Sequence, residues 1–366
     1  MASTFKTLLN SDIANTRTLL HEAIPITGSI LSGTYQNVPG TEENIKTFAH
    51  GMFEAVFDYP FLSSSANHIL DISAGYAAQS SLSAAANTQN SKKINIYNQH
   101  AQILAGYDTN GNVLQFDTDG DVAGGGSKMN EVFFLNFARL LTKDEIKKES
   151  FRLNLYSTAS STVASVPGPL NRAGLRLIGD YGAATNYKVN SPAGEYGLLY
   201  TSSAAPDGDG SSVVGHVYYQ AGIAVITASY FSGAFTDPNN KPHGVIGKAK
   251  TAVNYVLTSS TITEAANAFR FTVDNIDFNN TTELNSTIYF CRANTLDYNY
   301  SANPTYLTAS KIRVKDGLST KAEPVSYITT VGLYSADNEL LAVAKLSEPL
   351  KKSPSNEVTL RVRLDY

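Results

Sequence analysis

The sequence is poor in several residue types, and each shortage excludes a class of protein. One cysteine, Cys291, among 366 residues excludes an intrachain disulfide framework. Charged residues make up 16% of the chain, below the usual quarter, and the formal net charge is -4. A chain with this charge balance is not expected to bind nucleic acid in general. A hydrophobic content of 42% still provides material for a substantial core.

Targeting signals are also missing from the sequence pattern. The first 20 residues lack a charged segment followed by an apolar one, which a secretory signal requires. No apolar run approaches the ~20 residues that span a bilayer as a helix. We therefore expect a soluble chain that is made in a cytoplasm and has no membrane partner.

Aromatic residues are unevenly represented, with 21 tyrosines, 16 phenylalanines and no tryptophan. Tyrosine brings a large contact area at a low entropic cost, so a tyrosine-rich, charge-poor surface suits protein contacts. A tyrosine-rich β core explains the same composition equally well. The composition does not decide between the two.

Hydrophobic periodicity predicts helices in the first third of the chain. Apolar residues recur at spacings of three and four between Thr41 and Leu62, where Pro60 ends the pattern. A shorter helix is expected within residues 1–24 and a third over Glu131–Leu141. The stripe of the first helix consists of Ile45, Phe48, Ala49, Met52, Phe53, Val56 and Phe57.

After Phe151 the hydrophobic pattern changes to a period of two, which is typical of strands. The last ten residues alternate clearly, with apolar side chains on one face and polar ones on the other. Chain termini usually fray unless a sheet or a partner holds them, so this ending is expected to be paired. The expected strands are FRLNLYS, GLRLIGDY, EYGLLYTSS, GHVYYQAGIAVITASYF, FRFTVDNIDF, ITTVGLYS, LLAVAKLS and EVTLRVRLDY.

Together these patterns predict an α+β fold that is mostly β in residues 150–366. Antiparallel sheets are expected to form a sandwich-like core, preceded by a helical N-terminal part. The expected domains are a mixed helical region over residues 1–150, a β-rich region over 151–262 and a C-terminal antiparallel β domain over 263–366. The last two are also compatible with one continuous unit.

An acidic, glycine-rich loop over Asp117–Lys128 is the candidate metal site. Asp117, Asp119 and Asp121 alternate, so their carboxylates can converge on one hard cation. An EF-hand loop has Gly at its sixth position and Glu at its twelfth, where this chain has Val122 and Lys128. These departures favour a solvated turn, and we predict no bound metal.

Other catalytic or cofactor-binding signatures are absent from the sequence. The six histidines form no closely spaced pair of the kind that binds zinc. The glycine triplet before Ser127 and Lys128 has the wrong residue order for a phosphate-binding loop. No Gly-x-Ser-x-Gly motif is present. We predict no catalytic residue, no cofactor and no enzymatic activity.

The C-terminal segment is locally basic, through Lys351, Lys352, Arg361 and Arg363. These side chains can pair with an acidic partner surface. They can also be a solvated sheet face whose lysines protect an edge strand from association.

Several segments resemble virion structural proteins of tailed bacteriophages, especially marine myovirus-like ones. The main one is TTVGLYSADNELLAVAKLSEPLKK, since similar strands occur in phage tail-fibre and baseplate-attachment proteins. The resemblance covers much of residues 136–366. The other segments are YFCRANTLDYNYSANPTYL, SPAGEYGLLYTSS, GHVYYQAGIAVITASYF and NFARLLTKDEIKKESFRLNL.

The resemblance implies a non-enzymatic structural subunit of the tail, baseplate or neck, made in the host bacterial cytoplasm and located in the virion. Its expected partners are copies of itself and other virion proteins. Alternatives are a capsid-associated protein or a module that binds a host surface glycan. If the chain is such a structural subunit, the predicted assembly-interface residues are Lys351, Lys352, Arg361, Arg363 and Tyr366.

Overall fold

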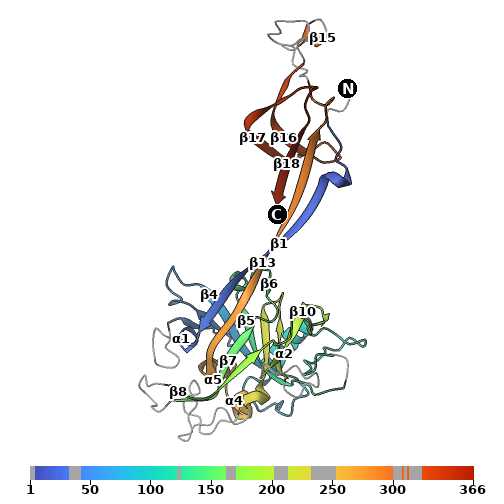
Figure 1. The fold of residues 1–366 in the computed structure, drawn as a ribbon. Helices are drawn as coiled ribbons and strands as arrows, with labels where there is room; N and C mark the ends of the chain where they lie inside the picture. Colours follow the sequence, from blue (N-terminus) through green and yellow to red (C-terminus); the bar gives the residue numbers. More distant parts are fainter. Residues whose placement is uncertain are drawn as a thin grey trace. The chain divides into compact units, whose positions relative to one another are not determined.

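The chain is mostly β and is built around one large antiparallel sheet (Figure 1). Its computed structural model describes residues 5–32, 43–121, 125–161, 170–201, 213–231, 253–299, 307–308, 311–312 and 324–366. The predicted α+β class with a helical N-terminal part is therefore wrong. The N-terminal segment forms a strand, and the described helices are short.

Fourteen of the described strands join in the large sheet. Its main path runs β1-β13-β7-β8-β10-β11-β12-β5-β4-β3-β2, while β18 and β6 pair with β13 and β9 pairs with β10. The strands are β1 (Ile13–Thr27), β2 (Ile45–Thr47), β3 (Glu54–Phe57), β4 (His68–Tyr76), β5 (Glu131–Phe137), β6 (Glu145–Ile146), β7 (Arg152–Ser161), β8 (Leu170–Gly179), β9 (Lys188–Ser191), β10 (Gly194–Tyr200), β11 (Val213–Tyr218), β12 (Ile223–Thr227), β13 (Val273–Ala293) and β18 (Val358–Asp365).

The remaining described elements are two small hairpins and several short helices. One hairpin pairs β14 with β15, and the other pairs β16 with β17. They are β14 (Leu307–Thr308), β15 (Lys311–Ile312), β16 (Ser326–Tyr334), β17 (Leu340–Lys352), η1 (Asn10–Asp12), α1 (Gly28–Ser32), α2 (Asn90–Leu104), α3 (Arg139–Thr142), η2 (Ala228–Phe231), α4 (Val253–Ser259) and α5 (Ile262–Thr272).

The chain divides into two compact units. Unit 1 comprises Met1–Leu19 and Glu283–Tyr366, and unit 2 comprises Leu20–Thr282. The long strands β1 and β13 each contribute residues to both. Unit 1 thus combines the two ends of the chain.

The helix predicted over Thr41–Leu62 is wrong where the structure describes this segment, because residues 45–47 and 54–57 form β2 and β3. The two strands pair with each other, and β3 also pairs with β4. Between them Gly51 has a φ of +61°, which a helix does not contain. Apolar residues three and four apart mark a helix, but a short run of them also fits two strands that are joined by a turn.

The other two predicted N-terminal helices are strands as well. Residues 13–27 form β1, which ends the main path of the sheet, so Pro25 removes no donor that a second neighbour needs. Residues 131–137 form β5, which lies between β4 and β12. Pairing on both sides and burial on both faces decide in favour of a strand for the apolar run in β5. The short α3 follows it.

Helices cover both faces of the sheet in unit 2, so the core is not the predicted sandwich of two sheets. Alternate residues of β5 point to opposite faces. Phe133 lies in one buried cluster with Phe269 of α5, and Phe134 lies in another with Tyr97 of α2. Gly75 of β4 permits the close approach of α2, because a Cβ atom there would lie 2.6 Å from the Lys93 carbonyl oxygen.

The sequence pattern did not identify α5, since residues 269–272 were assigned to a strand. A capping box starts this helix: the Thr261 hydroxyl accepts a hydrogen bond from the Glu264 amide at 3.2 Å, and the Glu264 carboxylate accepts one from the Thr261 amide at 2.7 Å. Arg270 is fully buried and donates to the Leu31 carbonyl and to Asn267, each at 2.6 Å. Side-chain hydrogen bonds therefore satisfy part of the buried guanidinium.

Tyrosine contributes much of the core of unit 2. Tyr76, Tyr97, Tyr196, Tyr218 and Tyr219 are among its largest fully buried side chains. The Tyr97 and Tyr196 hydroxyls donate to backbone carbonyls, at 3.0 and 2.9 Å. The tyrosine-rich core is therefore one correct interpretation of the composition.

His216 of β11 is a buried titratable group within this aromatic region. Its ring centroid lies 5.2 Å from that of Tyr196, and its Nε2 atom has no hydrogen-bond partner. Burial lowers the pKa of His216 from 6.5 to about 4, although the nearby Asp117 backbone and Asp119 favour the charged form. The folded protein therefore holds His216 neutral where the unfolded chain would protonate it.

This pKa shift predicts how His216 affects stability at different pH values. Above pH 6.5 the neutral His216 contributes fully to the free energy of unfolding. This contribution falls by about 3 kcal/mol as the pH drops toward 4, because His216 of the unfolded chain binds a proton at a higher pH than His216 of the folded protein. Chemical denaturation of the wild type and of His216→Phe measures this effect. The free energy of unfolding of the wild type minus that of the variant should decrease as the pH falls from 6.5 to 4. A difference that does not change with pH would contradict the assignment.

Candidate assembly interface

The buried hydrophobic clusters that the described residues form both belong to unit 2. All members of both clusters lie between Ile26 and Phe278, which is outside unit 1. Among the described residues of unit 1, the buried apolar side chains are Ile288 and Ala293, each 7% exposed. The other apolar side chains between its strands, such as Leu333 and Leu360, stay partly exposed, so they bury less apolar area than a closed core would.

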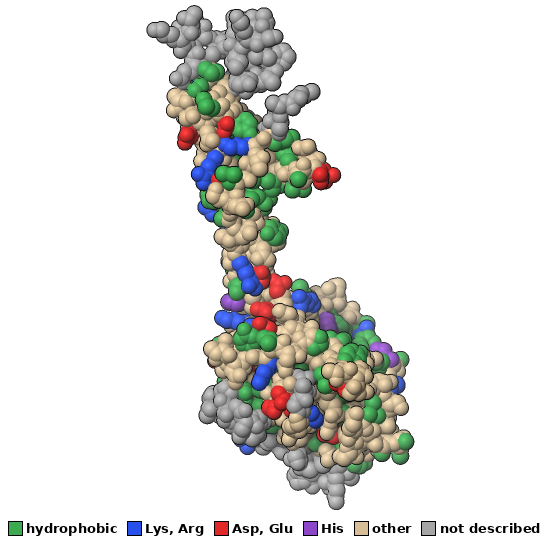
Figure 2. Space-filling view, turned by 90° about the vertical axis from the view of Figure 1, so that its right-hand side faces the viewer, with side chains coloured by type: hydrophobic (Ala, Val, Ile, Leu, Met, Phe, Trp, Pro, Cys, Tyr) green, Lys and Arg blue, Asp and Glu red, His purple; other side chains and the backbone are tan. Residues whose placement is uncertain are grey.

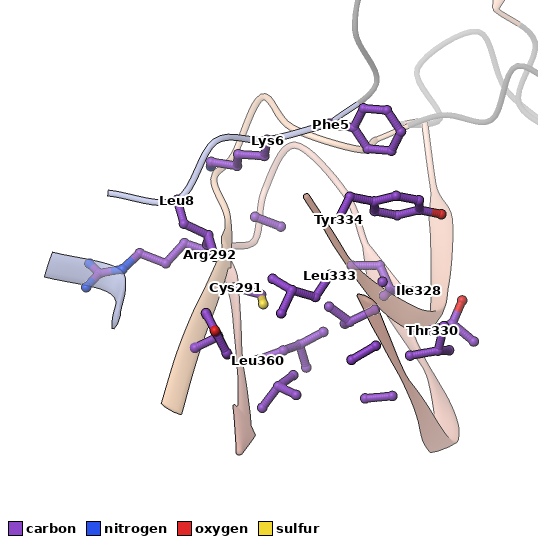
Figure 3. Close-up of a pocket in the computed structure, with 18 of the residues that line it drawn as sticks. Phe5, Lys6, Leu8, Cys291, Arg292, Ile328, Thr330, Leu333, Tyr334 and Leu360 are labelled. Atoms are coloured by element: carbon purple, nitrogen blue, oxygen red, sulfur yellow. The ribbon is translucent and has the colours of Figure 1, made fainter. Parts of the chain in front are cut away.

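A groove of about 870 Å³ takes the place of a core in unit 1 (Figure 3). It lies between the β13–β18 ladder and the β16–β17 hairpin, and the segment before η1 contributes Phe5 and Leu8. Leu333 and Leu360 point into it from the two layers, together with Cys291. The groove is therefore a space with both apolar and polar walls between two sheet layers that do not close on each other.

Strand register explains why the β13–β18 layer presents an apolar face to this groove. Cys291 pairs with Leu360, and Tyr289 pairs with Val362. Directly paired residues of antiparallel strands point to the same face, so all four side chains line the groove. The intervening residues of β18, Arg361 and Arg363, point to the opposite face.

Polar contacts fix the N-terminal segment along the groove. Lys6 pairs with Asp297 at 2.6 Å, and Asp12 pairs with Arg292 at 2.9 Å. The hydrogen bond from Lys6 lowers the pKa of Asp297. Burial raises the pKa of Cys291, and the nearby Asp12 carboxylate adds to this effect. The half-buried thiol is thus held in its protonated, unreactive form.

The β16–β17 hairpin also exposes apolar side chains, some of them at the rim of the groove. Hydrophobic side chains are visible at the surface of the part that carries β16, β17 and β18 (Figure 2). Six of them on this hairpin are each 37–63% exposed. They are Tyr327, Tyr334, Leu340, Leu341, Val343 and Leu350.

The strands around the groove have open edges. Within the described residues, β18 pairs with β13, and β16 and β17 pair with each other and with no third strand. An open edge presents unpaired amide and carbonyl groups that another chain can extend. A two-stranded sheet is also marginally stable without further packing.

The five predicted interface residues all lie in unit 1. Arg361, Lys351 and Tyr366 are exposed. Arg363 bonds Asp365 at 2.6 Å and Ser286 at 3.0 Å.

Lys352 differs from the other four because its side chain is buried. Its ammonium group donates to Asn299 at 2.7 Å and to the carbonyls of Ser353 and Thr295 at 3.0 and 3.2 Å. These bonds place Lys352 inside unit 1 rather than on its surface. In this structure it anchors the end of β17 to the segment after β13.

The terminal strand is paired, as the sequence pattern predicts, but its partner is β13 and not β17. Eight residue pairs join the two strands, from Ser286–Asp365 to Ala293–Val358. The C-terminal strands therefore do not form a simple meander. The turn over Ala336–Glu339 connects β16 to β17.

The structure brings Asp117, Asp119 and Asp121 together in unit 2, with one carboxylate oxygen from each within 4.8 Å of the others. Asp117 is fully buried, and one of its oxygens has no hydrogen-bond partner. Gly126 closes over these carboxylates with a φ of +49°, and a Cβ atom there would lie 2.9 Å from Asp117 Oδ1. The loop also contains residues 122–124, which lie outside the described residues.

Lys128 occupies the position in this loop where a calcium-binding loop supplies a glutamate. Its ammonium group contacts the Asp117 carboxylate directly. Burial raises the pKa of Asp117, while Lys128 and its hydrogen bond lower it. The backbone amide of Asp121 lowers the pKa of Asp119. The chain thus supplies a cation of its own to the acidic cluster.

The sequence interpretation did not identify the groove, because its walls come from segments far apart in the chain. Phe5 lies against Tyr334, with ring centroids 4.6 Å apart. Cys291 is one of the groove residues and is half-buried. One sequence feature could have indicated an exposed apolar surface here. Consecutive apolar residues such as Leu340-Leu341-Ala342-Val343 place apolar side chains on both faces of a strand.

Comparisons with protein-family models, with curated proteins and with solved structures gave no significant match. Among the described helices, none combines the length and the apolar character that crossing a bilayer requires.

The Asp117–Lys128 contact generates a prediction for unit 2. Lys128→Met should lower the free energy of unfolding by about 2 kcal/mol, because it leaves a buried carboxylate beside two others without compensation. Millimolar calcium should restore part of this loss in the variant, since it can take the place of the ammonium group. Lys143→Met, which removes an exposed pair with Glu22, serves as the control and should change stability little. Calcium stabilisation of the wild type would contradict this account.

Proposed function

We propose that this chain is a non-enzymatic structural subunit of a tailed-phage virion, in the tail, baseplate or neck, and that it assembles through unit 1. The observation that carries the proposal is the incomplete core of unit 1. Its two sheet layers enclose a groove with apolar and polar walls, expose apolar side chains and have open strand edges.

The energetic reason for assembly follows from the exposed area. The six exposed hairpin side chains are spread along both strands and together present an area on the order of 600 Å². Burying this surface contributes about 25 cal/mol per Å² before the costs of association are subtracted. A partner that covers this hairpin therefore supplies burial that the isolated unit lacks.

The charged groups beside the groove support a structural role. Lys6 and Arg292 are paired with carboxylates, and Lys352 is bonded to carbonyl and amide oxygens. The half-buried thiol of Cys291 has a raised pKa. An active site typically gathers groups whose pKa values are shifted toward the reaction's needs. This groove instead combines apolar walls with polar groups that already bond one another.

The resemblance to virion structural proteins supports the same proposal. It is carried by the segment that forms β16 and β17, and this hairpin also carries the exposed apolar surface. Its expected partners are copies of the chain and other virion proteins.

Mass spectrometry of purified particles, separated into heads and tails, tests the proposed function. The chain should appear in the tail fraction at a fixed stoichiometry to its neighbours. Its presence in the head fraction would instead favour a capsid-associated protein. Absence from both fractions would overturn the virion assignment.

A further inference from the structure

Two exposed surfaces of unit 1 carry opposite charges. The first is the hairpin tip, formed by Asp337, Glu339, Leu340 and Leu341 at the β16–β17 turn. Within the described residues, the carboxylates of Asp337 and Glu339 form no ion pair or hydrogen bond, and both residues are exposed. The acidic tip is thus bordered by two leucines that are 52% and 63% exposed.

The second surface is the β18 outer face, formed by Phe290, Arg361 and Arg363 on the side of the β13–β18 ladder away from the groove. Arg361 pairs in register with Phe290, so the guanidinium and the half-buried ring share one face. Arg361 is exposed and forms no ion pair among the described residues. The β18 outer face therefore combines an available cation with apolar surface.

These two surfaces cannot meet within one copy. Leu360 and Val362 line the groove, on the side where the hairpin lies. Arg361 alternates with them and points away from the hairpin of the same chain. A contact between the hairpin tip and the β18 outer face must therefore join two molecules.

We propose that the hairpin tip of one copy docks on the β18 outer face of a second copy of this chain. This inference rests on the proposed structural function and names the partner of unit 1. Asp337 and Glu339 of one copy face the arginines of the next, and Leu340 and Leu341 cover the ring of Phe290. In a head-to-tail arrangement this contact between two different surfaces repeats from copy to copy into a ring or a filament.

Charge favours a second copy in this arrangement. A twofold pairing of two β18 edges centred on Arg361 sets like charges opposite each other, which opposes association. The head-to-tail contact replaces this repulsion with complementary charges.

Charge reversal tests the contact, with sedimentation of the full-length chain over a range of concentrations as the measurement. The wild type should self-associate. The tip variant Asp337→Lys/Glu339→Lys and the edge variant Arg361→Glu should each raise the dissociation constant tenfold or more, because each places like charges in contact. The three substitutions combined should restore association. Glu348→Lys, an exposed charge change on the same hairpin away from the tip, should associate like the wild type.

Sedimentation of a mixture of the tip variant and the edge variant provides a second test. Circular dichroism of each variant alone serves as the control that it is folded. Each variant repels its own copies. In the mixture, the hairpin tip of each variant faces a β18 outer face of opposite charge on the other variant, so alternating assemblies should form. A wild type that stays monomeric, or a combined variant and mixture that both fail to associate, would overturn the proposed contact. If these results overturn the contact but the wild-type chain is still found in the tail fraction, the self-contact is wrong and the proposed structural function stands.

Discussion

The organisation of the molecule depends on one strand, β13. It spans 21 residues and pairs with β7 and β6 through its first part and with β18 through its last eight described positions. Without the β18 ladder, the C-terminal residues would have no partner strand, and one wall of the groove would be missing. The pairing of the chain's last strand with β13 is therefore the constraint on which unit 1 depends.

The two units solve the problem of hydrophobic burial differently. In unit 2, helices α2 and α5 cover opposite faces of the sheet, and both clusters of buried side chains lie there. In unit 1, the second layer is a two-stranded hairpin, and the space between the layers remains a groove. Helices on both faces give a closed core, whereas a narrow hairpin leaves apolar surface for another molecule to cover.

The sequence predicted the strands of the second half well, because period-two alternation is explicit in segments such as residues 358–365. It predicted the N-terminal half poorly, because apolar residues three or four apart also fit two short strands around a turn at Gly51. Helix α2 contains several asparagines and β-branched residues, and its contact with β4 at Gly75 overrides their weak helix propensity. The N-terminal strands and α2 depend on contacts between segments that are far apart in the chain, and the local sequence pattern does not show such contacts.

The candidate site was accessible from the sequence only in part. The basic residues of β18 stood out, and their alternation with leucine and valine placed them on one face. Their position relative to the hairpin follows from the β13–β18 register, which joins residues more than 60 apart. The buried position of Lys352 likewise depends on Asn299 and on the carbonyl of Thr295, in a segment that no short-range pattern links to it.

Differential scanning calorimetry at several protein concentrations tests the central claim, that unit 1 is stabilised by association. A unit that gains stability from a partner copy melts at a temperature that rises with protein concentration, because mass action favours the folded, associated state. The account predicts two transitions, of which the one assigned to unit 1 moves upward with concentration while that of unit 2 does not. Two transitions that are both independent of concentration, or a single such transition, would contradict it.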